Sequence, residues 1–187
     1  MKRYLIFLPN AITVLRMLLT AVFALLLVDW LSQGGKEVPY EMYLIYGFIC
    51  LSDLIDGAAA RRLKAQTSLG SILDILADSL FIFTSLIILD YYRLMPVWFI
   101  GVVFVNFLAF AVTSWFHRSK SRTKDRRFFV FDKLGRYAAV IFYLTPAAAC
   151  LAFLCPGFRV WFHAMLYLSV LLTALSFAKR SAHCLIS

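Results

Sequence analysis

Apolar stretches of about 20 residues, separated by short polar connections, follow one another along the whole chain. Each is long enough to cross the hydrocarbon core of a bilayer as a helix, the form in which a single segment satisfies its own backbone in lipid. Of the 187 residues, 63% are hydrophobic and 17% aromatic, more apolar surface than a soluble domain of this size can bury. The sequence therefore predicts an all-α polytopic membrane protein.

We expect six transmembrane helices in one domain that covers residues 1–187, with no separate soluble domain. The start Met1-Lys2-Arg3 imitates a signal peptide, but no small-residue cleavage site follows cleanly, so the first helix is expected to be retained. Five of the expected spans are residues 5–28, 69–91, 97–116, 134–154 and 158–177. The second span in chain order starts near residue 42 and ends in the first half of an aspartate motif that begins at residue 53.

Lysine and arginine are concentrated after the second and fourth spans and at both termini, whereas the other connections hold one each, Lys36, Arg93 and Arg159. The positive-inside rule then predicts that both termini lie in the cytoplasm. The net charge of +9 is explained by this rule and by attraction to anionic lipid, including at the basic stretch 117–127, so no nucleic-acid partner is expected. The four cysteines show no paired metal spacing, and a bridge between Cys150 and Cys155 stays open.

Four aspartates lie where the second and third predicted spans meet their connection. Asp53 and Asp56 are three residues apart, and Asp74 and Asp78 are four apart, so each pair shares a helix face. If the two helices pack as an antiparallel pair, the four carboxylates converge and need counter-charge. Hard divalent cations prefer such oxygen ligands, and two of them about 3.5–4 Å apart suit a displacement at phosphorus. Acids this close to a span are costly and usually functional.

The full pattern from residue 53 to residue 78 reads Asp-x2-Asp-Gly-x2-Ala-Arg-x8-Gly-x3-Asp-x3-Asp. It resembles, without a mismatch, the signature of the CDP-alcohol phosphotransferases, also called CDP-alcohol phosphatidyltransferases. The resemblance implies a compact enzyme of six helices that transfers a phosphatidyl group from CDP-diacylglycerol to an alcohol and releases CMP. It also implies two Mg²⁺ or Mn²⁺ ions per site and a homodimer.

The same resemblance implies a role for each motif residue. Asp78 is implied as the general base, in addition to its contact with metal. The small residues make room for the nucleotide, and the arginine binds its phosphates. The implied metal ligands are Asp53, Asp56, Asp74 and Asp78, and the implied nucleotide-binding residues are Gly57, Ala60, Arg61 and Gly70. Helix packing is an alternative explanation for Gly57.

The acceptor is indicated by a second segment, residues 9–16, in which Asn10, Thr13 and Arg16 share one helix face. Similar segments occur in phosphatidylglycerophosphate synthases and cardiolipin synthases of this family, which favours glycerol 3-phosphate. Arg16 lies well inside an apolar run and needs a partner. The candidate cations for the acceptor are Lys133, Arg136, Arg118 and Arg16.

Two departures from the synthase pattern keep serine, inositol phosphate and phosphatidylglycerol open as acceptors. Ser79 stands where these synthases usually have lysine, and Val105-Asn106-Phe107 offers no Arg-Glu pair in the fourth span. Outside this class, an aspartate-rich prenyltransferase and a small ion transporter also use intramembrane acids. Neither explains the small residues at these spacings. We expect a bacterial cytoplasmic membrane, with the aspartates opening to the cytoplasm.

Overall fold

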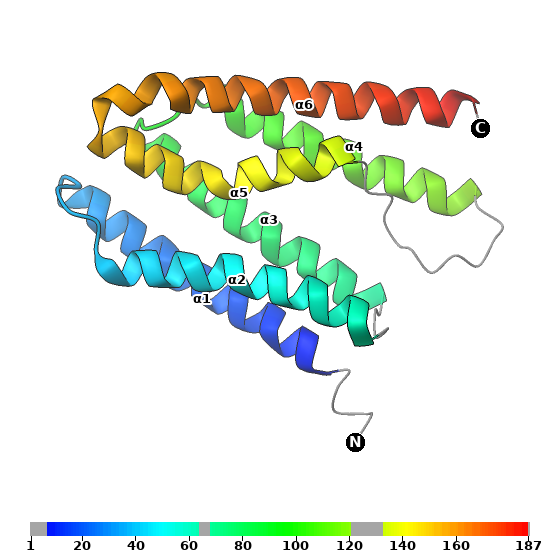
Figure 1. Cartoon of the computed structure of the whole chain (residues 1–187), viewed down its shortest axis with the longest axis horizontal. Helices are drawn as coiled ribbons and strands as arrows, with labels where there is room; N and C mark the ends of the chain where they lie inside the picture. Colours follow the sequence, from blue (N-terminus) through cyan, green and yellow to red (C-terminus); the bar gives the residue numbers. More distant parts are fainter. Residues whose placement is uncertain (1–6, 64–67, 121–132, 187) are drawn as a thin grey trace. The chain divides into compact units, whose positions relative to one another are not determined.

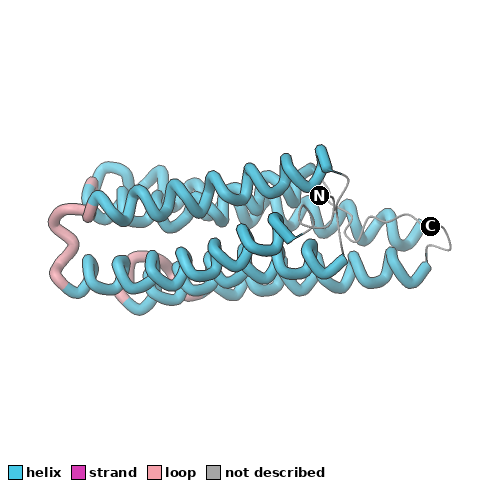
Figure 2. Tube along the Cα trace, turned by 90° about the horizontal axis from the view of Figure 1, so that it is seen from below, coloured by secondary structure: helices cyan, strands magenta, loops and turns pink. Residues whose placement is uncertain are grey.

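The computed structural model describes residues 7–63, 68–120 and 133–186, with side chains at residues 11–52, 70, 72–112 and 134–179. Helices and the loops between them make up all of these residues, and they contain no strand (Figures 1 and 2). The all-α prediction is confirmed. The elements are α1 (Phe7–Ser32), α2 (Tyr40–Leu63), α3 (Ser68–Tyr91), α4 (Trp98–Lys120), α5 (Lys133–Leu154), the short 3-10 turn η2 (Pro156–Phe158) and α6 (Arg159–Ile186).

The contacts between these helices divide the chain into two compact units, Met1–Tyr92 and Arg93–Ser187. The first unit holds α1, α2 and α3, and the second holds α4, α5, η2 and α6. Each unit is described by itself below. The prediction of one domain over residues 1–187 stays a prediction.

In the first unit, α1 packs against both α2 and α3. One aromatic cluster joins all three helices: the ring of Phe23 on α1 lies 5.9 Å from that of Tyr46 on α2 and 5.6 Å from that of Phe81 on α3. The rings of Tyr46 and Phe81 are 6.0 Å apart, centre to centre. Tilted ring pairs at such separations are favourable beyond the area that they bury. Helices α2 and α3 therefore meet, with α1 packed against both.

Substituting Phe81 with alanine is expected to lower the free energy of unfolding by about 3 kcal/mol, the lower end for such a truncation. The cost lies at the lower end of the range because lipid is as apolar as the protein interior, so the variant loses mainly side-chain packing and little hydrophobic stabilisation. The measurement is thermal unfolding of the purified protein in detergent. Ile87→Ala on the same helix is the control, since that side chain is 57% exposed, and an equal loss in both variants would contradict the packing role of the cluster.

In the second unit, α5 and α6 pack along each other, and α4 packs against α6. Phe99 on α4 meets Phe142 on α5 edge to face, with ring centres 6.0 Å apart. Trp98 stacks on Tyr167 of α6 at 5.8 Å. No disulfide joins Cys150, which is buried, to Cys155, which is exposed, since both are free. This resolves the pairing that the sequence left open.

Among the described residues, four segments are long and apolar enough to cross a membrane: Ala11–Ser32, Ile72–Tyr91, Leu134–Leu154 and Pro156–Lys179. The described side chains of α4 end at Val112, and its apolar segment Trp98–Val112 reaches that limit. Those of α2 end at Ser52, so most of the motif half on α2 lies outside this comparison. The finding supports four of the six expected spans, and the orientation of the termini stays a prediction.

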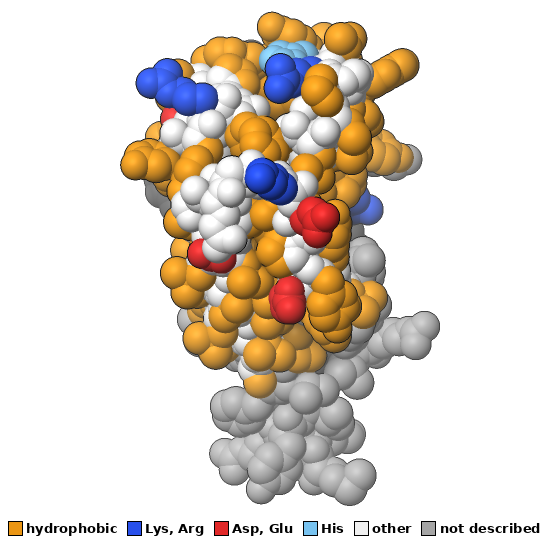
Figure 3. Space-filling model, turned by 90° about the vertical axis from the view of Figure 1, so that its left-hand side faces the viewer, with side chains coloured by type: hydrophobic (Ala, Val, Ile, Leu, Met, Phe, Trp, Pro, Cys, Tyr) orange, Lys and Arg blue, Asp and Glu red, His pale blue; other side chains and the backbone are white. Residues whose placement is uncertain are grey.

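Apolar side chains on the outside of the helices fit this membrane setting. On α1, Leu18 and Leu25 are 62% and 71% exposed, and on α6 Val160 is 76% exposed. Figure 3 views the molecule from the left-hand side of Figure 1, and hydrophobic side chains cover much of this face, with charged side chains scattered among them. Exposed apolar surface on this scale marks a surface that is covered, here by lipid.

The helices extend beyond the apolar stretches from which they were predicted. Helix α1 continues through Asp29, and there the Ser32 hydroxyl donates to the Asp29 carbonyl and the Gln33 side chain donates to the Asp29 carboxylate. The helix ends at Gly34 and Gly35, whose φ angles of 86° and 62° favour glycine and whose N–H groups bond the carbonyls of the last turn. Polar helix ends of this kind lie outside any apolar pattern, which explains why the observed helix is longer than its predicted span.

Candidate active site

An arginine of α1 holds two of the motif aspartates of α3. The Nη1 atom of Arg16 donates to Oδ1 of Asp74 at 3.0 Å and to Oδ1 of Asp78 at 2.8 Å. The Arg16 side chain is fully buried, whereas those of Asp74 and Asp78 are 39% and 30% exposed. The two carboxylates therefore converge on one cation and still reach the surface of the described residues.

Local helix geometry prepares both sides of this contact. Asp74 and Asp78 are one turn apart on α3, so they present their carboxylates on one face. On α1, Thr13, Arg16 and Thr20 share a face, and all three are buried. The Thr20 hydroxyl donates to the carbonyl of Arg16 at 2.9 Å, which satisfies it within its own helix. Of the three residues predicted to share one helix face, Thr13 and Arg16 do so, and the side chain of Asn10 lies outside the described residues.

The electrostatics of the cluster are those of one cation between two anions. Ionised hydrogen bonds of this kind are about twice as strong as neutral ones. The guanidinium offsets the repulsion between the two carboxylates, which lie within one helix turn of each other. Because Arg16 is fully buried, removing either side of the contact is costlier than for a surface ion pair.

The rest of the motif lies on the C-terminal part of α2 and the first turn of α3. Asp53, Asp56, Gly57, Ala60 and Arg61 all lie on α2, and their side chains are outside the described part of the chain. Gly70 is the third residue of α3 and is half-buried. The placement of the two motif halves on two successive helices is confirmed. The convergence of all four carboxylates stays a prediction.

Within the described side chains, no group of three or more histidines, cysteines, aspartates or glutamates could hold a metal ion. Asp53 and Asp56 fall outside that search, so the predicted four-carboxylate site is not tested by it. The described pair Asp74 and Asp78 fits one side of such a site, because both direct an oxygen at the same cationic nitrogen. Carboxylate oxygens are also the ligands that hard divalent ions prefer.

The comparison with family models decides the class of the protein. The model of the CDP-alcohol phosphatidyltransferases matches residues 6–178. The chain belongs to the CDP-alcohol phosphatidyltransferase family. The resemblance inferred from the motif is confirmed, and the chain is a member of a family of transferases that make phospholipids in membranes.

Individual relatives of the CDP-alcohol phosphatidyltransferase family carry different acceptor names. A CDP-diacylglycerol–glycerol-3-phosphate 3-phosphatidyltransferase of Bacillus subtilis is 34% identical over 114 residues, 57% of this chain and 58% of the relative. One of the same name from Pseudomonas fluorescens is 37% identical over 84 residues, 43% and 40% of the two chains. A probable cardiolipin synthase of Drosophila melanogaster is 34% identical over 96 residues, 51% and 28%. The chain thus spans less than two thirds of the length of these relatives.

The candidate acceptor cations are distributed over both units of this family member. Arg136, near the start of α5, is exposed. Lys133 begins α5 and Arg118 lies on α4, and their side chains are outside the described residues. Arg16 was grouped with these cations, but the structure places it on the motif aspartates. The sequence signal for this contact was an arginine deep in an apolar run, which requires a partner without naming it.

Proposed function

We propose that this protein transfers a phosphatidyl group from CDP-diacylglycerol to glycerol 3-phosphate and releases CMP. The observation that carries the proposal is the pairing of Asp74 and Asp78 by Arg16, within a motif of the CDP-alcohol phosphatidyltransferase family. A buried cation that orients two partly exposed carboxylates is an arrangement for chemistry, since a purely structural ion pair needs only one acid.

In the proposed reaction, the hydroxyl oxygen of the acceptor attacks the lipid-side phosphorus of the pyrophosphate. The new oxygen–phosphorus bond forms as the bond to the CMP oxygen breaks. Asp78 takes the proton of the attacking hydroxyl, a role that requires an accessible carboxylate. With 30% of its side chain exposed, Asp78 meets that requirement. Arg16 fixes the carboxylate from the buried side, so that it keeps one orientation toward the substrate.

We further propose that Asp53, Asp56, Asp74 and Asp78 hold one or two Mg²⁺ or Mn²⁺ ions. Bound there, the ions would neutralise the negative charge that grows on the departing CMP. Support comes from the oxygen-only donor set and from the convergence of Asp74 and Asp78 on a cationic nitrogen. On α2, the proposal assigns Gly57 and Ala60 to the nucleotide and Arg61 to its phosphates, with Gly70 on α3 beside them.

The setting of this reaction is also a proposal. The distribution of lysine and arginine supports a cytoplasmic site in a bacterial membrane, with both termini on the same side. We propose a homodimer by analogy with the family. For the acceptor, the segment 9–16 and the names of two relatives support glycerol 3-phosphate. Serine, inositol phosphate and phosphatidylglycerol are the alternatives, and a cardiolipin synthase among the relatives favours the last of these.

A panel of acceptors tests the assignment. The full chain, purified in detergent with Mn²⁺, would be given radiolabelled CDP-diacylglycerol and one acceptor at a time. We expect CMP release and a new labelled lipid with glycerol 3-phosphate, and only background without acceptor. Turnover with another member of the panel alone would reassign the acceptor. Absence of CMP release with all of them, together with ion flux in vesicles, would replace the transferase by a transporter.

A further inference from the structure

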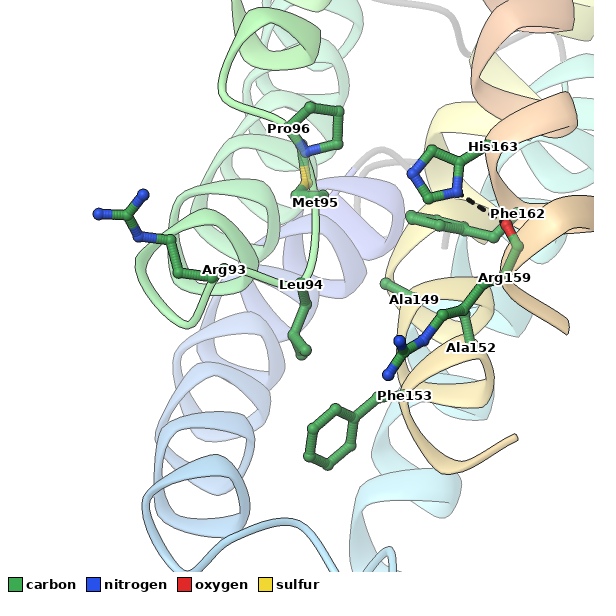
Figure 4. A pocket seen from close by; sticks show the side chains of 10 residues that line it. All are labelled: Arg93, Leu94, Met95, Pro96, Ala149, Ala152, Phe153, Arg159, Phe162 and His163. Carbon is green, nitrogen blue, oxygen red and sulfur yellow. Dashed lines mark hydrogen bonds between the residues drawn. The ribbon is translucent and has the colours of Figure 1, made fainter. Parts of the chain in front are cut away.

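A cavity of about 420 Å³ lies in the unit Arg93–Ser187, apart from the motif aspartates (Figure 4). Its walls come from three places: the turn Arg93–Pro96, the end of α5 and the start of α6. The apolar part is formed by buried side chains, among them Met95, Ala152 and Phe162. Its volume is within the range of ligand pockets and is large enough for a lipid headgroup.

Two cation-forming side chains of α6 line this cavity. Arg159 and His163 are one helix turn apart, and both point from α6 toward the turn Arg93–Pro96 in Figure 4, whereas the guanidinium of Arg93 points away. The Nδ1 atom of His163 is 2.8 Å from the carbonyl oxygen of Arg159. A carbonyl only accepts, so Nδ1–H is the donor, and Nε2 is directed elsewhere. A guanidinium and an imidazole thus share one side of an otherwise apolar cavity.

Within the described residues of this unit, no acid neutralises these groups. The described residues 93–120 and 133–186 contain neither aspartate nor glutamate. The first turn of α6, where Arg159 lies, contains no acidic residue, and the positive end of the helix dipole lies there. Arg93 has a φ of 59°, a left-handed backbone that non-glycine residues adopt at a cost and that recurs where ligands are held. The cavity is therefore suited to an anion.

Its depth in the membrane identifies the kind of anion. The apolar segment of α5 ends at Leu154, and that of α6 begins at Pro156, so the cavity lies where two spans end. This is the level of the lipid phosphates. Asp74 and Asp78 lie in the first half of α3, and Arg93 comes two residues after its last residue, Tyr91. The candidate span Ile72–Tyr91 therefore contains both aspartates in its first half and ends just before the turn that lines the cavity.

We propose that this cavity binds the phosphate of an anionic phospholipid, at the level where α5 ends and α6 begins. The phosphate would accept from Arg159 and His163, and the glycerol end would contact the apolar wall. The bound lipid is not consumed there, so the site is additional to the proposed transfer reaction. Its binding can be measured whether or not the protein releases CMP, so the two proposals fail separately.

Native mass spectrometry of the full chain in detergent tests this site. The probe is phosphatidylglycerol, with phosphatidylcholine as the neutral comparison and inorganic phosphate as competitor. The double substitution Arg159→Gln/His163→Gln is expected to weaken phosphatidylglycerol binding about tenfold or more, the effect of losing charge-assisted hydrogen bonds. Lys36→Gln removes one exposed cation from the α1–α2 connection, outside the cavity, and is expected to leave binding unchanged.

Three outcomes would overturn the proposal. An equal loss in Lys36→Gln, or no loss in the double variant, would mean that the lipid responds to overall charge. Displacement of the lipid by millimolar inorganic phosphate would assign the cavity to the free anion. Arg159 and His163 are both exposed, so the double variant is expected to unfold at the same temperature as the parent in phosphatidylcholine micelles. That measurement separates lost binding from lost folding.

Discussion

Asp78→Asn is expected to abolish CMP release while the protein stays folded and still binds a cytidine nucleotide. Asparagine has the shape of aspartate, and its amide oxygen can still accept from Arg16, so the α1–α3 contact is kept in outline. The amide cannot take the proton of the acceptor. Loss of a general base alone lowers turnover by about 10²–10⁴-fold. The measurement is CMP release, with nucleotide binding followed by calorimetry.

Asp90→Asn is the matched control for this variant. Asp90 lies on the same helix near its other end and is half-buried, so the substitution removes the same charge away from Arg16. Its turnover should stay within about twofold of the parent, as for a surface change far from the chemistry. Normal turnover in Asp78→Asn would remove Asp78 as the base. Loss of nucleotide binding in that variant would instead assign it to holding metal and nucleotide.

Arg16→Met is expected to have the second large effect, on both stability and metal affinity. The substitution keeps an apolar side chain of similar length but leaves two adjacent carboxylates without their shared cation. Removing one partner of a buried ion pair costs about 3–5 kcal/mol, and we expect about 2–3 kcal/mol here because water partly screens the two exposed carboxylates. The carboxylates also lose their fixed orientation, so Mn²⁺ binding and turnover should both weaken.

Arg16→Lys and Thr20→Val make this test specific. Lysine keeps the charge but lacks the planar fork, so its Mn²⁺ affinity should lie between those of the parent and Arg16→Met. Thr20 lies on the same buried face and bonds its own helix, so Thr20→Val should leave Mn²⁺ affinity unchanged. Paramagnetic resonance of Mn²⁺ measures this without relying on activity. Tighter binding in Arg16→Met would show that Arg16 competes with the metal, contrary to a positioning role.

Much of the fold could be predicted from local pattern. Helix α5 was expected over residues 134–154 and is observed over Lys133–Leu154, because length and apolarity alone determine a membrane helix. The ends of α1 and α6 could not be predicted in this way. Helix α6 continues to Ile186, past residue 177, where its predicted span ended.

The candidate site, too, could be predicted from the sequence only in part. Spacing placed Asp74 and Asp78 on one face of one helix and indicated that Arg16 needs a partner, since both are properties of a single helix. Which helix would present that partner depends on how α1 packs against α3, a contact between residues 58 and 62 positions apart in the chain. No periodicity within one segment carries that information.

The sequence by itself determined the class of the protein: a helical membrane chain with a CDP-alcohol phosphatidyltransferase motif divided between two successive helices. Only the tertiary structure decided that a buried arginine of α1 joins Asp74 to Asp78, and that Arg159 and His163 line one cavity with the turn Arg93–Pro96. The physical reason is that helix formation depends on neighbours within one turn or two. Charge pairing across helices depends instead on side-chain packing between distant segments.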